Sequence, residues 1–186
     1  MKEYEIIKKY TDWKWMCQIE KLPEDFIEKY QNELTWDYIC SYQKLSENFL
    51  RKHKDKVYWN YISAFQKLSE KFICEFQDYI VWGEISYYQS LSEDFIREFA
   101  DKIDWHIISE SQKLSENFIR EFQNNLDWKY LSEYQILSED FIREFQDKVD
   151  WYYISLYQNL SKDFIIEYKD KLIMKNIIQN ERRRNN

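Results

Sequence analysis

The sequence is short of the residues that build turns, linkers and reactive sites. Among its 186 residues there is one glycine (Gly83), one proline (Pro23), two histidines and three cysteines. So little glycine and proline leaves almost no material for flexible linkers or β-turns. A glycine-rich phosphate loop, a nucleophile elbow and a zinc-protease motif are all missing. The sequence therefore predicts a non-enzymatic protein that uses no cofactor and no metal.

Long apolar runs and a surplus of basic residues are missing too. No apolar run approaches the roughly 18 residues of a membrane span, and the first ten residues, MKEYEIIKKY, mix charges with apolar residues, unlike a signal peptide. A net charge of −7 argues against a general nucleic-acid binder, which carries a basic face. We therefore expect a soluble intracellular protein without a membrane partner, whose cysteines stay reduced.

What the sequence does contain is a strict repeat. Seven tryptophans fall 23 residues apart without a slip, at Trp13, Trp36, Trp59, Trp82, Trp105, Trp128 and Trp151. Seven phenylalanines keep the same step, at Phe26, Phe49, Phe72, Phe95, Phe118, Phe141 and Phe164. A period of this length is typical of repeat architectures, in which each repeat packs on its neighbours.

Each repeat reads as two short helices. Counted from the tryptophan as offset 0, apolar residues recur at offsets 0, 3, 6, 9, 13, 14, 17 and 21, and steps of three and four indicate helix. Aspartate or threonine before the tryptophan, and a serine at offset 10, are good N-caps. The pattern predicts a helix from Trp151 to about Asn159 and a second from Lys162 to about Leu172, with weaker caps at Tyr58 and Val81.

The predicted fold is all-α: an α-solenoid of about seven 23-residue helix-turn-helix repeats with capping helices at both ends. Residues 1–12 are expected to form an N-terminal capping helix, 13–173 the seven repeats, and 174–186 a closing helix with a basic tail. The tryptophans and phenylalanines should be the core. The first helix of each repeat should form the inner layer, covered on most sides, and the second should be the more exposed one.

Residues with chemical potential mostly have structural explanations. His53 and His106 occupy different offsets, and repeated acidic pairs such as Glu139-Asp140 lie where a helix begins and suit its dipole. The glutamine series leaves two interpretations open, because a half-buried amide at offset 7 either bonds the backbone of the turn or forms a ladder facing a ligand. Its members are Gln43, Gln66, Gln89, Gln112, Gln135 and Gln158.

Offsets 1 and 5 vary while the repeat frame stays fixed. They share one helix face, so they should line a strip that a partner protein contacts. Tyr87, Tyr152 and Leu156 are the expected anchors, because exposed aromatic and apolar side chains dominate interface energies. The candidate partner-binding residues are Tyr87, His106, Glu110, Lys129, Glu133, Tyr152 and Leu156.

The phrase LSEDFIREFQDKVDWYYIS resembles tandem repeats in uncharacterised proteins of giant DNA viruses that infect amoebae, over residues 13–173. The resemblance implies a viral protein in the cytoplasm of the infected host cell, and it implies no activity. We expect a repeat scaffold for protein–protein interaction, with a host protein as one possible partner. The alternatives are a nucleic-acid-binding helical repeat, with bases stacked on aromatic rings, and a structural component that self-assembles. The oligomeric expectation is a monomer or weak end-to-end self-association.

Overall fold

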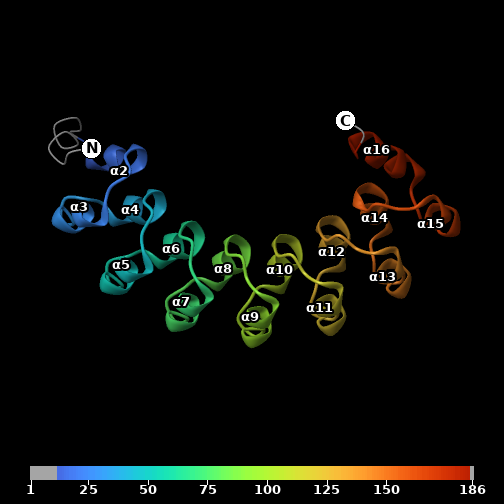
Figure 1. Ribbon diagram of the computed structural model, residues 1–186, viewed down its shortest axis with the longest axis horizontal. Coiled ribbons are helices and arrows are strands. Elements are labelled where there is room, and N and C mark those ends of the chain that lie inside the picture. Colours follow the sequence, from blue (N-terminus) through green and yellow to red (C-terminus); the bar gives the residue numbers. More distant parts are fainter. Residues whose placement is uncertain (1–11, 185–186) are drawn as a thin grey trace. The chain divides into compact units, whose positions relative to one another are not determined.

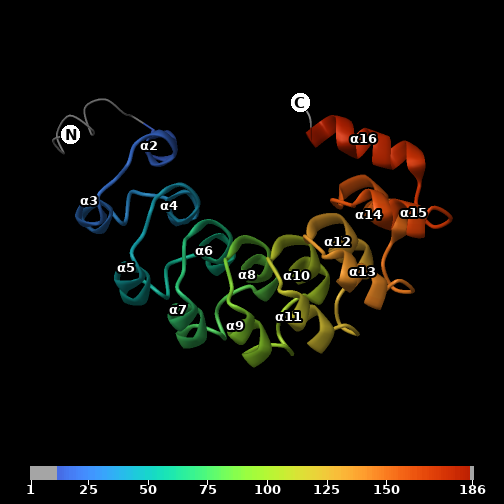
Figure 2. The same cartoon turned by 45° about the vertical axis from the view of Figure 1, so that its right-hand side comes forward.

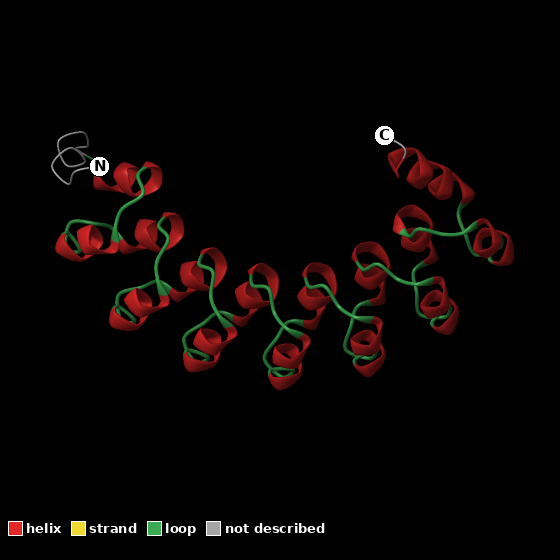
Figure 3. Cartoon of the chain, viewed as in Figure 1, coloured by secondary structure: helices red, strands yellow, loops and turns green. Residues whose placement is uncertain are grey.

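The computed structural model describes residues 12–184, and over that range it contains helices and turns and no strand (Figure 3). The helices come in pairs that repeat at the 23-residue period, and neighbouring pairs pack on one another. The predicted all-α solenoid architecture is therefore confirmed. The predicted N-terminal capping helix lies almost wholly outside the described residues.

The chain divides between Gln89 and Ser90 into two compact units. In the N-terminal unit, the helices that begin at a tryptophan, called A helices here, are α2 (Trp13–Ile19), α4 (Trp36–Tyr42), α6 (Trp59–Phe65) and α8 (Trp82–Tyr88). The second helices of the repeats, called B helices, are α3 (Glu24–Lys29), α5 (Glu47–Lys52) and α7 (Glu70–Glu75). Figures 1 and 2 show α4, α6 and α8 following one another in one row, with α5 and α7 in a second.

The C-terminal unit repeats this plan. Its A helices are α10 (Trp105–Ser111), α12 (Trp128–Tyr134) and α14 (Trp151–Tyr157), and its B helices are α9 (Glu93–Glu98), α11 (Glu116–Glu121), α13 (Glu139–Glu144) and α15 (Lys162–Glu167). Helix α16 (Met174–Arg184) packs on α14 as the next A helix would (Figure 1). It begins at Met174, where the next tryptophan would fall.

Side-chain caps begin most of the helices, as the sequence predicts. The carboxylate of Asp104 accepts from the N–H groups of His106 and Ile107, and Asp12, Asp127 and Asp150 act alike. At the B helices a serine hydroxyl accepts from the N–H of the phenylalanine three residues on, at Ser46, Ser69, Ser92, Ser115, Ser138 and Ser161. Tyr58 and Val81 provide no such bond. Thr35 occupies the predicted N-cap position of α4, but its side chain provides no such bond either.

The B helices are shorter than the sequence predicts. Helix α15 ends at Glu167 instead of about Leu172, because Tyr168 leaves the helical conformation with φ −109° and ψ 23°. The carbonyl of Tyr168 then accepts from the N–H groups of Lys171 (2.9 Å) and Leu172 (3.0 Å), which closes a tight turn. Leu172 is still buried, so it keeps its expected contact with the core although it lies outside the helix.

The core is built from aliphatic residues and phenylalanine, and the repeat tryptophans lie only at its edge. The phenylalanine series is buried throughout, and so is the aliphatic residue at offset 3, such as Ile108. Every described repeat tryptophan is only half-buried, so the prediction that these residues are core was wrong. Trp105 stacks on Phe122 with ring centroids 4.9 Å apart. Its indole N–H donates to the carbonyl of Ala100 at 2.9 Å, which ties the preceding turn to α10.

Candidate partner-binding surface

Within each unit, the glutamine series joins consecutive A helices through backbone hydrogen bonds. These six side chains are buried, with 4–7% exposure. In Gln135 the amide nitrogen donates to the carbonyls of Gln112 (2.7 Å) and Ser109 (3.3 Å), and the amide oxygen accepts from the N–H of Leu114 (3.1 Å). The same set of bonds recurs at Gln43, Gln66 and Gln158. The structural interpretation of the series therefore holds, and these amides do not face a ligand.

A second polar row uses the small residue at offset 4. The hydroxyl of Ser132 donates to the carbonyl of Trp128 at 2.7 Å and accepts from the N–H of Asp150 at 2.9 Å, so it links α12 to the start of α14. Cys40 takes the same place in α4, where its sulfur accepts from the N–H of Tyr58 at 3.4 Å. Burial raises the pKa of the Cys40 thiol to about 11, so it behaves as a small, unreactive interior residue.

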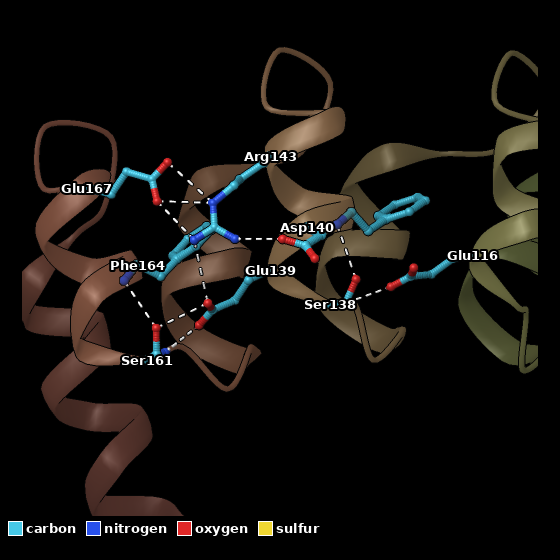
Figure 4. A network of polar contacts seen from close by, with 9 residues as sticks. Glu116, Ser138, Glu139, Asp140, Arg143, Ser161, Phe164 and Glu167 are labelled. Atoms are coloured by element: carbon cyan, nitrogen blue, oxygen red, sulfur yellow. Dashed lines mark hydrogen bonds and ion pairs between the residues drawn. The ribbon is translucent and has the colours of Figure 1, made fainter.

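Arginines join neighbouring B helices, and each makes an ion pair with a glutamate and a cation–π contact with a phenylalanine of the next B helix. The Arg143 guanidinium contacts the Glu167 carboxylate of the next B helix at 2.9 Å and lies 5.0 Å from the ring centroid of Phe164 (Figure 4). Arg51, Arg97 and Arg120 repeat both contacts with their own neighbours. In the same network the Ser138 N–H donates to Glu116 at 2.7 Å (Figure 4). Within each unit these contacts join neighbouring B helices, and they engage the arginines inside the protein.

Several of the predicted partner-binding residues are accessible to solvent on the A helices. Tyr87, on α8 in the N-terminal unit, is 47% exposed. In the C-terminal unit His106 is exposed on α10, where its Nδ1 lies 3.1 Å from Asp127 and its ring meets Tyr130 edge-on at 4.5 Å. Glu110, one turn further along α10, is half-buried.

Helices α12 and α14 carry the remaining predicted residues. Lys129 is exposed, Glu133 is half-buried and Tyr152 is 48% exposed. Leu156 was expected to be an exposed anchor, and this is wrong, because it is 7% exposed on α14, the helix that α16 packs against.

Sequence analysis missed a row of aromatic residues at offsets 2 and 6. It expected the first helix of each repeat to be covered on most sides, but Tyr134 is 51% exposed and Tyr130 is half-buried. We call these positions, over all A helices, the aromatic face. In the N-terminal unit it contains Trp15, Tyr38, Tyr42, Tyr61, Phe65 and Tyr88, and in the C-terminal unit Tyr130, Tyr134, Tyr153 and Tyr157. Period alone cannot reveal its exposure, since a covered stripe and an exposed stripe share one spacing.

A hollow on this face lies between α4 and α6. It has a volume of about 470 Å³ and is lined by Asp37, Tyr38, Ser41, Tyr42, Tyr61 and Phe65. The rings stand in two near-parallel pairs, with Tyr38 and Tyr42 at 5.9 Å and 28°, and Tyr61 and Phe65 at 6.1 Å and 20°. Pockets that bind small ligands typically measure about 300–1,000 Å³, and the volume of this hollow lies within that range.

Two further properties bear on function. Among residues 12–184 no group of three or more His, Cys, Asp or Glu side chains is arranged to hold a metal ion. No helix in the described part of the chain is long and apolar enough to cross a membrane.

Comparison with protein-family models, curated proteins and solved structures finds no match. Any functional conclusion therefore depends on the surface itself.

Proposed function

We propose that the protein is a non-enzymatic repeat scaffold that binds a partner protein through the aromatic face of its A helices. The supporting observation is the exposure of large rings on that face, including Trp15 at 51%, Tyr42 at 55%, Phe65 at 56%, Tyr88 at 54% and Tyr134 at 51%. Tyrosine and tryptophan are enriched at protein interfaces and among residues that dominate binding energy. Rings held on short, interlocked helices are already ordered, so binding loses little conformational entropy.

Nucleic-acid binding is the less favoured alternative. Bases stack well on tyrosine, but such proteins combine stacking with a positively charged groove that follows the phosphate backbone. Here Arg97, Arg120 and Arg143 are ion-paired to neighbouring glutamates, and the chain carries a net charge of −7. A partner protein is therefore favoured, and the giant-virus resemblance makes a host protein a natural first choice.

Affinity capture from amoebal lysate, with and without nuclease, tests this proposal. The test variant carries Tyr42→Ser and Phe65→Ser together, and the control carries Ile136→Ser, a change at a 96% exposed loop residue away from the aromatic face. We expect a protein partner that survives nuclease, is lost with the double variant and is retained by the control. Capture that disappears with nuclease would establish the nucleic-acid alternative, and a partner held equally by all three proteins would contradict the proposal.

Self-association is a second candidate, because apolar side chains are exposed near α16. Ile166 is 69% exposed, Met174 48% and Ile178 47%. Two copies meeting at these residues would bury them. Light scattering against protein concentration checks this: a mass that rises with concentration and falls back in an Ile166→Ser and Ile178→Ser variant supports it, and a constant monomer mass rejects it.

A further inference from the structure

The aromatic face contains two similar quartets of rings that differ in the charged residues beside them, with Asp37 and Ser41 in one where the other has Lys129 and Glu133. Between α4 and α6 the quartet is Tyr38, Tyr42, Tyr61 and Phe65, and between α12 and α14 it is Tyr130, Tyr134, Tyr153 and Tyr157. In both quartets the rings of each helix are stacked, with centroids 5.9–6.2 Å apart and planes 13–28° apart. Since the two sites share one geometry, a difference in their charged residues is informative.

In the α12–α14 quartet the protein supplies its own cation. The Lys129 ammonium lies 5.7 Å from the centroid of Tyr130 and 5.5 Å from that of Tyr153, so it bridges rings of both helices. A hydrogen bond with the Tyr153 side chain raises the pKa of Lys129. A cation within about 6 Å of an aromatic face is attracted by the negative face of the ring. This quartet is therefore already occupied.

The α4–α6 quartet has an acid where the other has Lys129. Offset 1 of α4 is Asp37, a half-buried residue that lines the 470 Å³ hollow with the four rings. One carboxylate oxygen accepts from the N–H of Tyr38 at 2.8 Å, and among the described residues no cation forms an ion pair with this carboxylate. Lys14 of α2 lies 5.9 Å from the centroid of Tyr38, so an internal cation reaches one ring of this quartet from the preceding helix. The site thus keeps the electron-rich rings, has a negative charge at offset 1 of its first helix and leaves a space open to solvent.

We infer that the α4–α6 quartet binds an arginine side chain of a partner protein, with the guanidinium between the two ring pairs and beside the Asp37 carboxylate. Arginine fits better than lysine because its planar group stacks on aromatic rings and pairs with a carboxylate through two N–H donors. Positive charge on the partner also matches the net charge of −7. The inference rests on the proposed scaffold function and specifies the chemistry of its partner.

Exchanging the two charges gives a matched pair of variants. Asp37→Lys should fill the α4–α6 quartet with an internal cation, and Lys129→Asp should open the α12–α14 quartet. Both changes place at offset 1 a residue that other repeats already carry there, since Lys14 and Lys129 occupy it in α2 and α12 and Asp37 in α4. Circular dichroism then verifies that each variant keeps the helical content of the parent.

The probe is a short glycine–serine peptide with one central arginine, and its controls are the same peptide with citrulline or lysine. Citrulline keeps the shape of arginine and removes its charge. Each peptide is titrated into the isotope-labelled full chain, and NMR shifts are followed at Tyr42 and Phe65. We expect saturable shifts with a dissociation constant on the order of 1 mM for the arginine peptide, at least about tenfold weaker binding with citrulline or with Asp37→Lys, and weaker binding with lysine. In Lys129→Asp, new shifts should appear at Tyr134 and Tyr157.

The outcomes separate this inference from the scaffold proposal. The arginine site would be overturned if Asp37→Lys bound the arginine peptide as tightly as the parent does, or if the citrulline peptide bound as tightly as the arginine peptide. NMR shifts spread over many acidic residues, instead of confined to the quartet, would overturn it as well. A captured partner that is lost with Tyr42→Ser and Phe65→Ser but retained by Asp37→Lys would leave the scaffold standing and remove the arginine assignment. If the quartet binds the arginine peptide but no captured partner depends on the aromatic face, the arginine site stands and the scaffold proposal falls.

Discussion

Replacing one residue of the glutamine series tests whether its side-chain amides hold the repeats together. Gln66 is 5% exposed, and its side chain accepts from the Leu45 N–H at 3.0 Å and donates to the carbonyls of Cys40 at 2.9 Å and Gln43 at 2.7 Å. Gln66→Ala removes all three bonds and leaves three buried backbone groups of α4 and its following turn without a partner. Because each orphaned buried group costs about 1–3 kcal/mol, we expect a loss of about 3–5 kcal/mol in the free energy of unfolding.

Two measurements check this value. Urea unfolding gives the global loss, and hydrogen exchange at the Leu45 amide gives the local one, which matters because repeat proteins do not always unfold in a single step. Gln18→Ala, on the exposed surface of α2, is the matched control and should stay within about 0.5 kcal/mol of the parent. If the free energy of unfolding fell by less than about 1 kcal/mol and hydrogen-exchange protection at Leu45 stayed unchanged, water would be replacing the amide. The glutamine series would then not hold the repeats together.

Gln66→Glu separates shape from hydrogen bonding. It keeps the size of the side chain and places a carboxylate against two carbonyl oxygens, so burial should raise the pKa of the new group above its unfolded value of about 4.3. The unfolded state then releases its proton first as pH rises. The variant should therefore lose more stability relative to the parent at about pH 7 than at about pH 4. A pH-independent difference would show that the new carboxyl group is solvated.

Three further predictions concern single side chains. Trp105→Ala should cost about 3 kcal/mol in urea unfolding and Trp105→Phe about 1 kcal/mol, because phenylalanine keeps the ring stack and loses the indole hydrogen bond; equal losses would contradict this. Burial lowers the pKa of His53 below 6.5 despite the opposing charge of Glu28. The contribution of neutral His53 to the free energy of unfolding should therefore be lost as pH falls below about 6.5. His53→Phe should remove that pH dependence. Intact-mass alkylation at about pH 8 should modify half-exposed Cys74 well before buried Cys17, whose pKa burial raises to about 11; simultaneous modification would contradict that burial.

The local structure of each repeat follows from the sequence. The tryptophan and phenylalanine steps give the 23-residue period, and a serine marks the beginning of every described B helix except α3, where Pro23 takes its place. The small residue at offset 4 lies where the next helix comes close, and Ser132 is fully buried there. These features are local or periodic, so spacing and capping chemistry are sufficient to predict them.

Exposure was decided by tertiary packing. The same helical spacing leaves Trp105 half-buried, Tyr134 exposed and Leu156 covered, because burial depends on which faces of an A helix its neighbours occupy. The α4–α6 quartet likewise needs two helices, since neither Asp37 nor a single tyrosine pair encloses a space alone. The sequence by itself determined the repeat, its helices and its buried aliphatic and phenylalanine residues, through period and capping. Only the tertiary structure decided which side chains face a partner, because that depends on contacts between residues of different repeats.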